Sequence, residues 1–244
     1  MKFPKIVVCN LLLWAQRIVF LFLLVVCITG CSKKHETPAP NDIWDIDKNG
    51  IPEFVKTNYI ELSKIYRISK YRSSVGHDYS DAYEKCRSLK HYFEPKTDID
   101  WTTVKTYAPV DGIITRVEQE WAGTKLEIAA DDYPAFRFSI FHINISRQFK
   151  IDDKVAEGEL LGTHFGSQTY SDISVIVNDP TRQGRMVSYF DVMTEALFKE
   201  FSDRGLSSKA DLIIPKTVRD ANPLTCSGDT FTSADLLENW VNLN

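Results

Sequence analysis

Alternating residues between Val104 and Gly162 constrain the fold of this chain more than any other feature. From position 113 every second residue falls on one face, in the series Ile113, Thr115, Val117, Gln119 and Trp121. Ala122-Gly123 then supplies a turn, and apolar residues continue at Leu126 and Ile128. Period-two alternation on both sides of a short Gly-containing connection predicts a β-hairpin.

A second series singles out the first candidate functional residue. Phe136, Phe138, Ile140 and His142 share one parity, so His142 ends a line of side chains that face a core. Further on, the odd positions 173, 175 and 177 are apolar, which places Asp172 and Ser174 together on the opposite face. The patterns predict a compact, mainly β core.

The size and charge of the chain restrict its class. Its 244 residues are 43% hydrophobic, enough for one domain with a sizeable core and appendages. The formal charge is −4, and no cluster of Lys and Arg is long enough to form a nucleic-acid groove. We therefore expect no nucleic-acid partner.

The N-terminus has the order of a secretion signal. Lys2 and Lys5 precede an apolar run from Ile18 to Ile28, which small residues follow. Ile28-Thr29-Gly30-Cys31 resembles the lipobox of bacterial lipoproteins, which implies a signal peptide over 1–30 and a lipid on Cys31. The alternative is an uncleaved transmembrane anchor. Both interpretations place the remainder outside the cytoplasm, in the cell envelope, and Ser32 favours the outer membrane by analogy with lipoproteins.

Cysteine usage agrees with an oxidising compartment. Two cysteines lie in the signal and Cys31 takes the lipid, so Cys86 and Cys226 remain as an even pair. The sequence predicts a disulfide between them. Two buried free thiols are the alternative.

The rest of the chain divides by composition and periodicity. We predict four regions after the signal peptide: a flexible tether over 31–44, a helical and loop region over 45–103, the β core over 104–187 and a helical extension over 188–244. Helical spacing predicts an amphipathic helix over 79–93, with His91 on its solvated side, and further helices from Ser188 towards Gly205 and over 233–241.

A short acidic segment follows the tether. It places oxygen ligands at alternate positions near a glycine, as calcium loops do, at Asp45, Asp47, Asn49 and Glu53. Lys56 stands where the loop of an EF-hand needs a bidentate Glu. Calcium binding and a solvated turn therefore both remain open.

Several motifs in the core resemble a known family. They are Ala108-Pro-Val-Asp-Gly112, Gly123-Thr-Lys-Leu-Glu-Ile128, Phe141-His142-Ile143, Lys154-Val155-Ala-Glu-Gly158-Glu-Leu-Leu-Gly162 and Asp172-Ile-Ser-Val. In order and spacing they resemble the lysostaphin/LytM-type metallopeptidases (duplicated hybrid motif) over about Ser74 to Val177. The resemblance implies a barrel-sandwich-hybrid β-sandwich and zinc-dependent cleavage of peptidoglycan.

The family's ligand residues are mostly absent. Gly76-His77-Asp78 matches the second half of the family's His-x-Gly-x-Asp segment, with Ser74 in place of the histidine. His142 matches a catalytic histidine, whereas the closing His-x-His falls on Asp172 and Ser174. The resemblance thus retains Asp78 as a zinc ligand and His142 as a catalytic residue.

Three interpretations of the site remain. The domain is degenerate and non-catalytic, or a rearranged metal site uses some of His77, Asp78, His142, His164 and Asp172, or these residues are structural. A lipoyl-type carrier is disfavoured because Lys154 does not lie at a hairpin tip. Serine catalysis is disfavoured because no Gly-x-Ser-x-Gly segment is present.

The sequence predicts a lipid-anchored envelope protein with a degenerate peptidase-like domain. Its predicted role is binding or regulation at the cell wall, with peptidoglycan or another envelope protein as partner. The alternative is an active zinc endopeptidase with a rearranged site, in which His142 and Asp172 take catalytic roles.

Overall fold

The computed structural model describes residues 42–244. The predicted signal peptide, the predicted lipidation site Cys31 and the predicted tether as far as residue 41 lie outside the described residues. Between residues 42 and 244, no helix is both long and apolar enough to cross a membrane.

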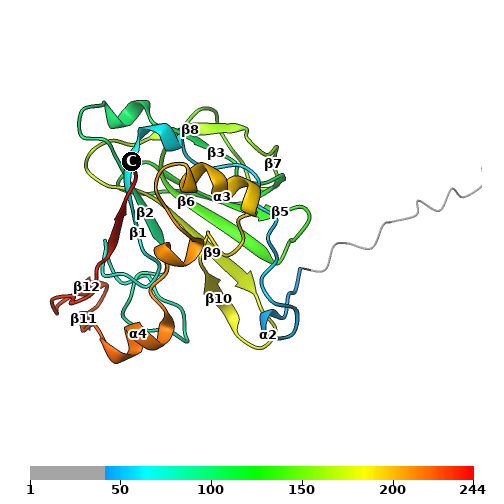
Figure 1. The fold of residues 1–244 in the computed structure, drawn as a ribbon. Coiled ribbons are helices and arrows are strands. Elements are labelled where there is room, and N and C mark those ends of the chain that lie inside the picture. The colour runs from blue at the N-terminus through cyan, green and yellow to red at the C-terminus, as the bar shows by residue number, and fades with distance from the viewer. Residues whose placement is uncertain (1–41) are drawn as a thin grey trace, which may run out of the picture. The chain divides into compact units, whose positions relative to one another are not determined.

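Strands dominate the described residues (Figure 1). The helices are short: α2 (Ile46–Asn49), α3 (Glu195–Ser202) and α4 (Lys216–Ala221), with 3₁₀ turns at Leu62–Lys64, Trp101–Thr103 and Lys209–Leu212. The strands are β1 (Ile65–Ser69), β2 (His91–Pro95), β3 (Lys105–Tyr107), β4 (Gly112–Gln119), β5 (Thr124–Ala130), β6 (Phe136–Ile145), β7 (Lys154–Val155), β8 (Leu160–His164), β9 (Ser171–Asn178), β10 (Gln183–Val187), β11 (Cys226–Ser227), β12 (Thr230–Phe231) and β13 (Trp240–Asn242).

Eleven strands form one antiparallel sheet. Its main path runs β13-β1-β2-β9-β6-β5-β4-β7, with β10 paired to β9, and β8 paired to both β6 and β3. Strands β1 and β2, from the predicted 45–103 region, therefore belong to the same sheet as the strands of 104–187. The prediction of a mainly β fold with flanking helices is confirmed.

One face of the sheet carries the core. The odd-numbered residues of β9 and the even-numbered residues of β6 between 136 and 140 are fully buried there. Helix α3, whose first turn is capped by Thr194, adds Leu197, Phe198 and Phe201 to the same cluster. The opposite face of β9 carries Asp172 and Ser174, which are also buried.

The predicted hairpin is present as β4 and β5, joined through Ala122-Gly123. Its parity departs from the prediction, since Ile114 is fully buried while Ile113 is half-buried. The register shifts between Ile114 and Arg116, so a β-bulge reverses the faces of β4 at this point.

The helix predicted over 79–93 is wrong. This segment is an irregular loop that leads into β2, and Cys86 has a left-handed backbone with φ 53°. Its apolar residues have separate uses: Leu89 is buried against Tyr71, whereas Tyr83 is 43% exposed. Although these apolar residues are spaced as in a helix, they do not share one buried face.

The C-terminal region is only partly helical. The helix predicted from Ser188 begins at Glu195 instead and ends at Ser202, shortly before Gly205 at φ 99°. The helix predicted over 233–241 is wrong, since β13 there pairs with β1. Cys86 and Cys226 form the predicted disulfide.

His91 is buried on β2, not solvated on a helix. Its Nδ1 donates to the Ser69 carbonyl at 2.9 Å, and the Ser188 hydroxyl donates to Nε2 at 2.8 Å. The backbone N–H of Phe190 donates to the same hydroxyl at 3.1 Å. Burial lowers the pKa of His91 from 6.5 to about 4, so the ring is neutral at pH 7.

This burial predicts an acid-sensitive stability. Between pH 6.5 and pH 4, His91 is protonated in the unfolded chain but not in the folded protein. The free energy of unfolding therefore decreases as the pH is lowered through this range. The loss attributable to His91 should reach about 2–3 kcal/mol at pH 4.5. Urea unfolding at pH 7.5 and 4.5 should show a smaller loss for His91→Gln than for wild type. Equal losses would refute this origin.

Candidate functional site

A β-bulge turns His142 away from the core line that its sequence parity predicts. Thr124 pairs with Ile143 but Leu126 pairs with Ile140, so β6 carries one extra residue, and His142 has φ 60°. Gly123 makes this close approach possible, because a Cβ there would lie 2.9 Å from the Ile143 carbonyl oxygen. His142 therefore leaves the core face and joins the polar face of the sheet.

On that face His142 meets Asp172. Its Nε2 lies 3.3 Å from Asp172 Oδ1, an ion-pair contact without hydrogen-bond alignment. Its Nδ1 lies 3.0 Å from the Ala122 carbonyl oxygen, which can only accept a hydrogen bond. Nδ1 thus carries a proton, and Nε2 faces the carboxylate. The two predicted catalytic residues are adjacent.

The other oxygen of the Asp172 carboxylate forms an ion pair with a lysine. Lys90 Nζ lies 2.7 Å from Asp172 Oδ2, and the two side chains are 2% and 0% exposed. The same ammonium lies 3.6 Å from the ring centroid of Phe141 and 4.1 Å from that of Tyr79. A buried carboxylate and two aromatic faces therefore hold one positive charge at the centre of the site.

Glu120 adds a second carboxylate at the edge of the site. Its Oε2 lies 3.7 Å from His142 Nδ1. Burial raises the pKa of this carboxyl, while the neighbouring His142 opposes the shift. Residue 120 therefore carries less negative charge at mildly acidic pH than an exposed glutamate does.

The predicted metal ligands have other partners. Asp78 Oδ1 accepts from the backbone N–H of Arg87 at 3.0 Å, and His77 Nδ1 lies 3.0 Å from the Asp78 carbonyl oxygen. His164 is buried on β8, with Nε2 2.9 Å from the Thr169 carbonyl oxygen. Burial lowers the pKa of His164, so this ring is neutral.

These residues do not fit a zinc ion. Zinc in a hydrolytic site takes three protein ligands and a water, and it needs their lone pairs. The carboxylate of Asp172 is already neutralised by Lys90, and Asp78 caps a loop. In the described part of the chain, no three His, Cys, Asp or Glu side chains form a group that could hold a metal ion.

A cavity of about 380 Å³ opens beside this site. Trp121, with 74% of its surface exposed, stands at its rim. The lining combines aromatic, acidic and basic side chains: His77, Tyr79, Lys90, Glu118, Gln119, Glu120, Trp121, Lys125, Phe141 and His142. Such a lining suits a polar ligand with rings or amides that stack on the aromatic faces.

Sequence reasoning missed Lys90, Glu120 and Tyr79. The signal for Lys90 is the alternation that leads into β2: Lys90, just before the strand, and Tyr92 share the face of Asp172, while His91 and Phe93 face the core side. The helix predicted for this segment hid that alternation.

Three of the four calcium candidates have other partners. Asp45 Oδ1 accepts from the backbone N–H of Lys48, Asp47 pairs with Arg185 at 2.8 Å, and Glu53 pairs with Lys209 at 2.6 Å. Asn49 ends the four-residue helix α2. The structure thus shows a capped turn with basic partners at this position.

Comparison with solved structures returns proteins of similar fold. A Helicobacter pylori Csd3 structure matches 59% of this chain at 14% identity and a TM-score of 0.42. The catalytic domain of lysostaphin from Staphylococcus simulans matches 46% of this chain and 81% of its own, at 18% identity and 0.33. A putative glycyl-glycine endopeptidase lytM from Ruminococcus gnavus matches 53% of this chain and 59% of its own, at 14% and 0.35.

These likenesses concern the fold, and they assign no role to any residue of this chain. The chain spans about a third (34%) of the length of the Csd3 structure. No protein-family model and no curated protein matches the sequence.

Proposed function

We propose that this protein is a lipid-anchored envelope protein whose peptidase-like domain binds peptidoglycan or an envelope protein without cleaving it. The observation that carries the proposal is the buried pair of Lys90 and Asp172. Its ammonium supplies a fixed positive charge, but an ammonium offers no open coordination position at which water could be activated. A groove can persist as a binding surface after its chemistry is lost.

Two features support binding at the cavity beside His142. The exposed indole of Trp121 offers a stacking surface at the rim, and the lining presents charged groups of both signs. The lipobox-like segment supports the envelope location, and the motifs quoted above support peptidoglycan as the partner.

The test incubates the full-length protein, purified in detergent, with isolated peptidoglycan sacculi in the presence of zinc. We expect the protein to sediment with the sacculi and to release no soluble fragments. Trp121→Ala should weaken sedimentation about tenfold, corresponding to the loss of about 1.4 kcal/mol of stacking. The matched control is Leu236→Ala, since Leu236 is 86% exposed and does not line the cavity.

Release of soluble fragments by wild type, abolished by His142→Ala, would establish the active endopeptidase instead. Absence of sedimentation would remove peptidoglycan as the partner.

A further inference from the structure

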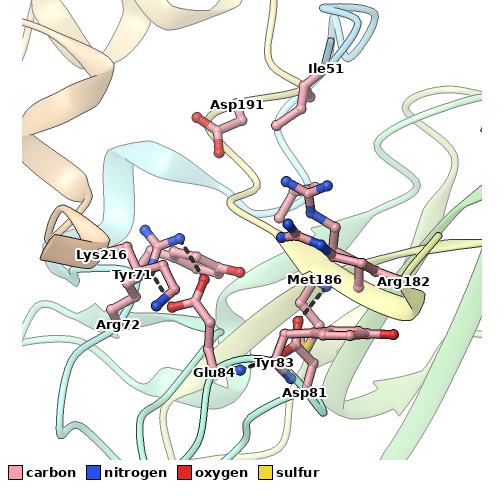
Figure 2. A pocket seen from close by; sticks show the side chains of 12 residues that line it. Ile51, Tyr71, Arg72, Asp81, Tyr83, Glu84, Arg182, Met186, Asp191 and Lys216 are labelled. Carbon is pink, nitrogen blue, oxygen red and sulfur yellow. Dashed lines mark hydrogen bonds and ion pairs between the residues drawn. The ribbon is translucent and has the colours of Figure 1, made fainter. Parts of the chain in front are cut away.

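A second cavity, of about 440 Å³, is lined by residues of β10 and by Lys216 at the start of α4 (Figure 2). It shares no lining residue with the cavity beside His142. Segments distant in sequence reach it, including the loop that follows β1 and the turn that precedes α3. Tyr71, Tyr83 and Met186 give it apolar walls, and Arg182, Arg185 and Asp191 give it charge.

Two of its carboxylates are fully engaged within the protein. Asp81 accepts from the backbone N–H groups of Tyr83 and Glu84 through Oδ1 and from that of Met186 through Oδ2. Glu84 accepts from Arg72 Nε at 2.6 Å and Nη2 at 2.8 Å. These groups fix the cavity wall and are not available to a ligand.

The Tyr71 hydroxyl, by contrast, is available. Tyr71 is 1% exposed, and its hydroxyl has no hydrogen-bond partner within residues 42–244. In Figure 2 the hydroxyl end of this ring points towards the open centre of the cavity. A buried hydroxyl without a partner is destabilising, and a ligand that hydrogen-bonds to it would remove that cost.

Asp191 lies across the cavity in Figure 2. Its Oδ2 accepts from the Ser188 backbone N–H at 3.3 Å, and burial raises the pKa of the carboxyl. The repulsion that this group would exert on an anion is therefore reduced.

Arg182 and Arg185 already contact carboxylates of the protein, and Arg185 Nη1 also lies 3.5 Å from Oδ2 of the buried Asp179. Arg185 Nη1 lies 2.8 Å from Asp47 Oδ1, and Arg182 Nη2 lies 3.7 Å from Asp47 Oδ2. The Asp47 side chain is 51% exposed, so this pair is screened by water and weak. The Arg182 guanidinium also lies 5.8 Å from the ring centroid of Tyr83. Guanidinium forks of this kind bind carboxylate and phosphate groups.

We propose that this cavity binds a small anionic molecule whose carboxylate or phosphate group contacts Arg182 and Arg185. The apolar or aromatic part of the ligand lies between Tyr71, Tyr83 and Met186. The Tyr71 hydroxyl forms a hydrogen bond with a polar atom of the ligand. Asp47 competes with the ligand for the two guanidinium groups. This binding is independent of the role proposed for the cavity beside His142.

Isothermal titration of the full-length protein in detergent tests the proposal, with N-acetyltyrosine, its uncharged amide and inorganic phosphate as probes. We expect N-acetyltyrosine or phosphate to bind, with the amide at least about tenfold weaker than its acid. Binding of phosphate alone assigns a phosphate ligand, and preference for N-acetyltyrosine assigns a carboxylate. Arg182→Gln should weaken binding about tenfold and Tyr71→Phe several-fold.

A variant that binds more tightly than wild type would exclude misfolding as the cause of the weaker binding of the other variants. Asp47→Asn removes the exposed one of the two carboxylates that contact Arg185 and should tighten binding several-fold. Arg116→Gln is the matched control, because Arg116 is 60% exposed on β4 and does not line the cavity. The proposal is overturned if neither anion binds at about 10 mM, if the amide binds as well as the acid, or if Asp47→Asn leaves affinity unchanged.

Discussion

Replacing Lys90 by methionine should lower the free energy of unfolding by about 3–5 kcal/mol, because it leaves the buried carboxylate of Asp172 without its main counter-charge. Methionine fills a similar volume between the rings of Tyr79 and Phe141, so lost packing contributes little. His142 Nε2 lies 3.3 Å from this carboxylate and supplies a counter-charge only when the ring is protonated. Urea unfolding followed by circular dichroism measures the change.

A second substitution separates charge from packing. Lys90→Met combined with Asp172→Leu removes both charges and should recover most of the stability, since an apolar pair avoids the cost of burying ions. The matched control is Lys199→Met, whose exposed pair with Asp203 should contribute under about 1 kcal/mol. If Lys90→Met costs no more than this control, Asp172 does not depend on Lys90 for its charge balance.

Removing the disulfide should have the second large effect. Cys86 and Cys226 are 140 residues apart in sequence, and closing a loop of this length stabilises the folded state by about 5 kcal/mol in the chain-entropy model. The Cys86→Ala/Cys226→Ala variant should therefore unfold at a much lower urea concentration than oxidised wild type.

Reduction of wild type serves as the independent check on this effect. Dithiothreitol should shift wild type to the midpoint of the double variant and leave the variant unchanged. A difference of less than about 1 kcal/mol between oxidised wild type and the variant would show that the unfolded chain is not restrained by this bond.

The strands of the core could be predicted because their periodicity is local. The alternation of apolar residues through Phe138 and Val175 predicts which side chains are buried. The pairing of Cys86 with Cys226 follows from counting cysteines. The segment before β2 could not be predicted in this way. Its apolar residues are used by a disulfide-bonded loop, and tertiary contacts override their helical spacing.

The site depends on two irregularities that period-two reasoning does not contain. The β-bulge at His142 moves this side chain from the core face of β6 to the polar face of the sheet. The imidazole, expected beside the core, therefore contacts Asp172. Lys90 belongs to the site only because β2 pairs with β9 in a register that sets Tyr92 opposite Asp172. That pairing joins residues about 80 positions apart, and no local pattern specifies it.

Crystals of the protein grown with excess zinc would test the central claim most directly, through anomalous diffraction at the zinc edge. We predict Lys90 Nζ within hydrogen-bonding distance of Asp172 and no anomalous peak beside that carboxylate. A zinc peak coordinated by Asp172 and His142, with the Lys90 side chain displaced, would contradict the account.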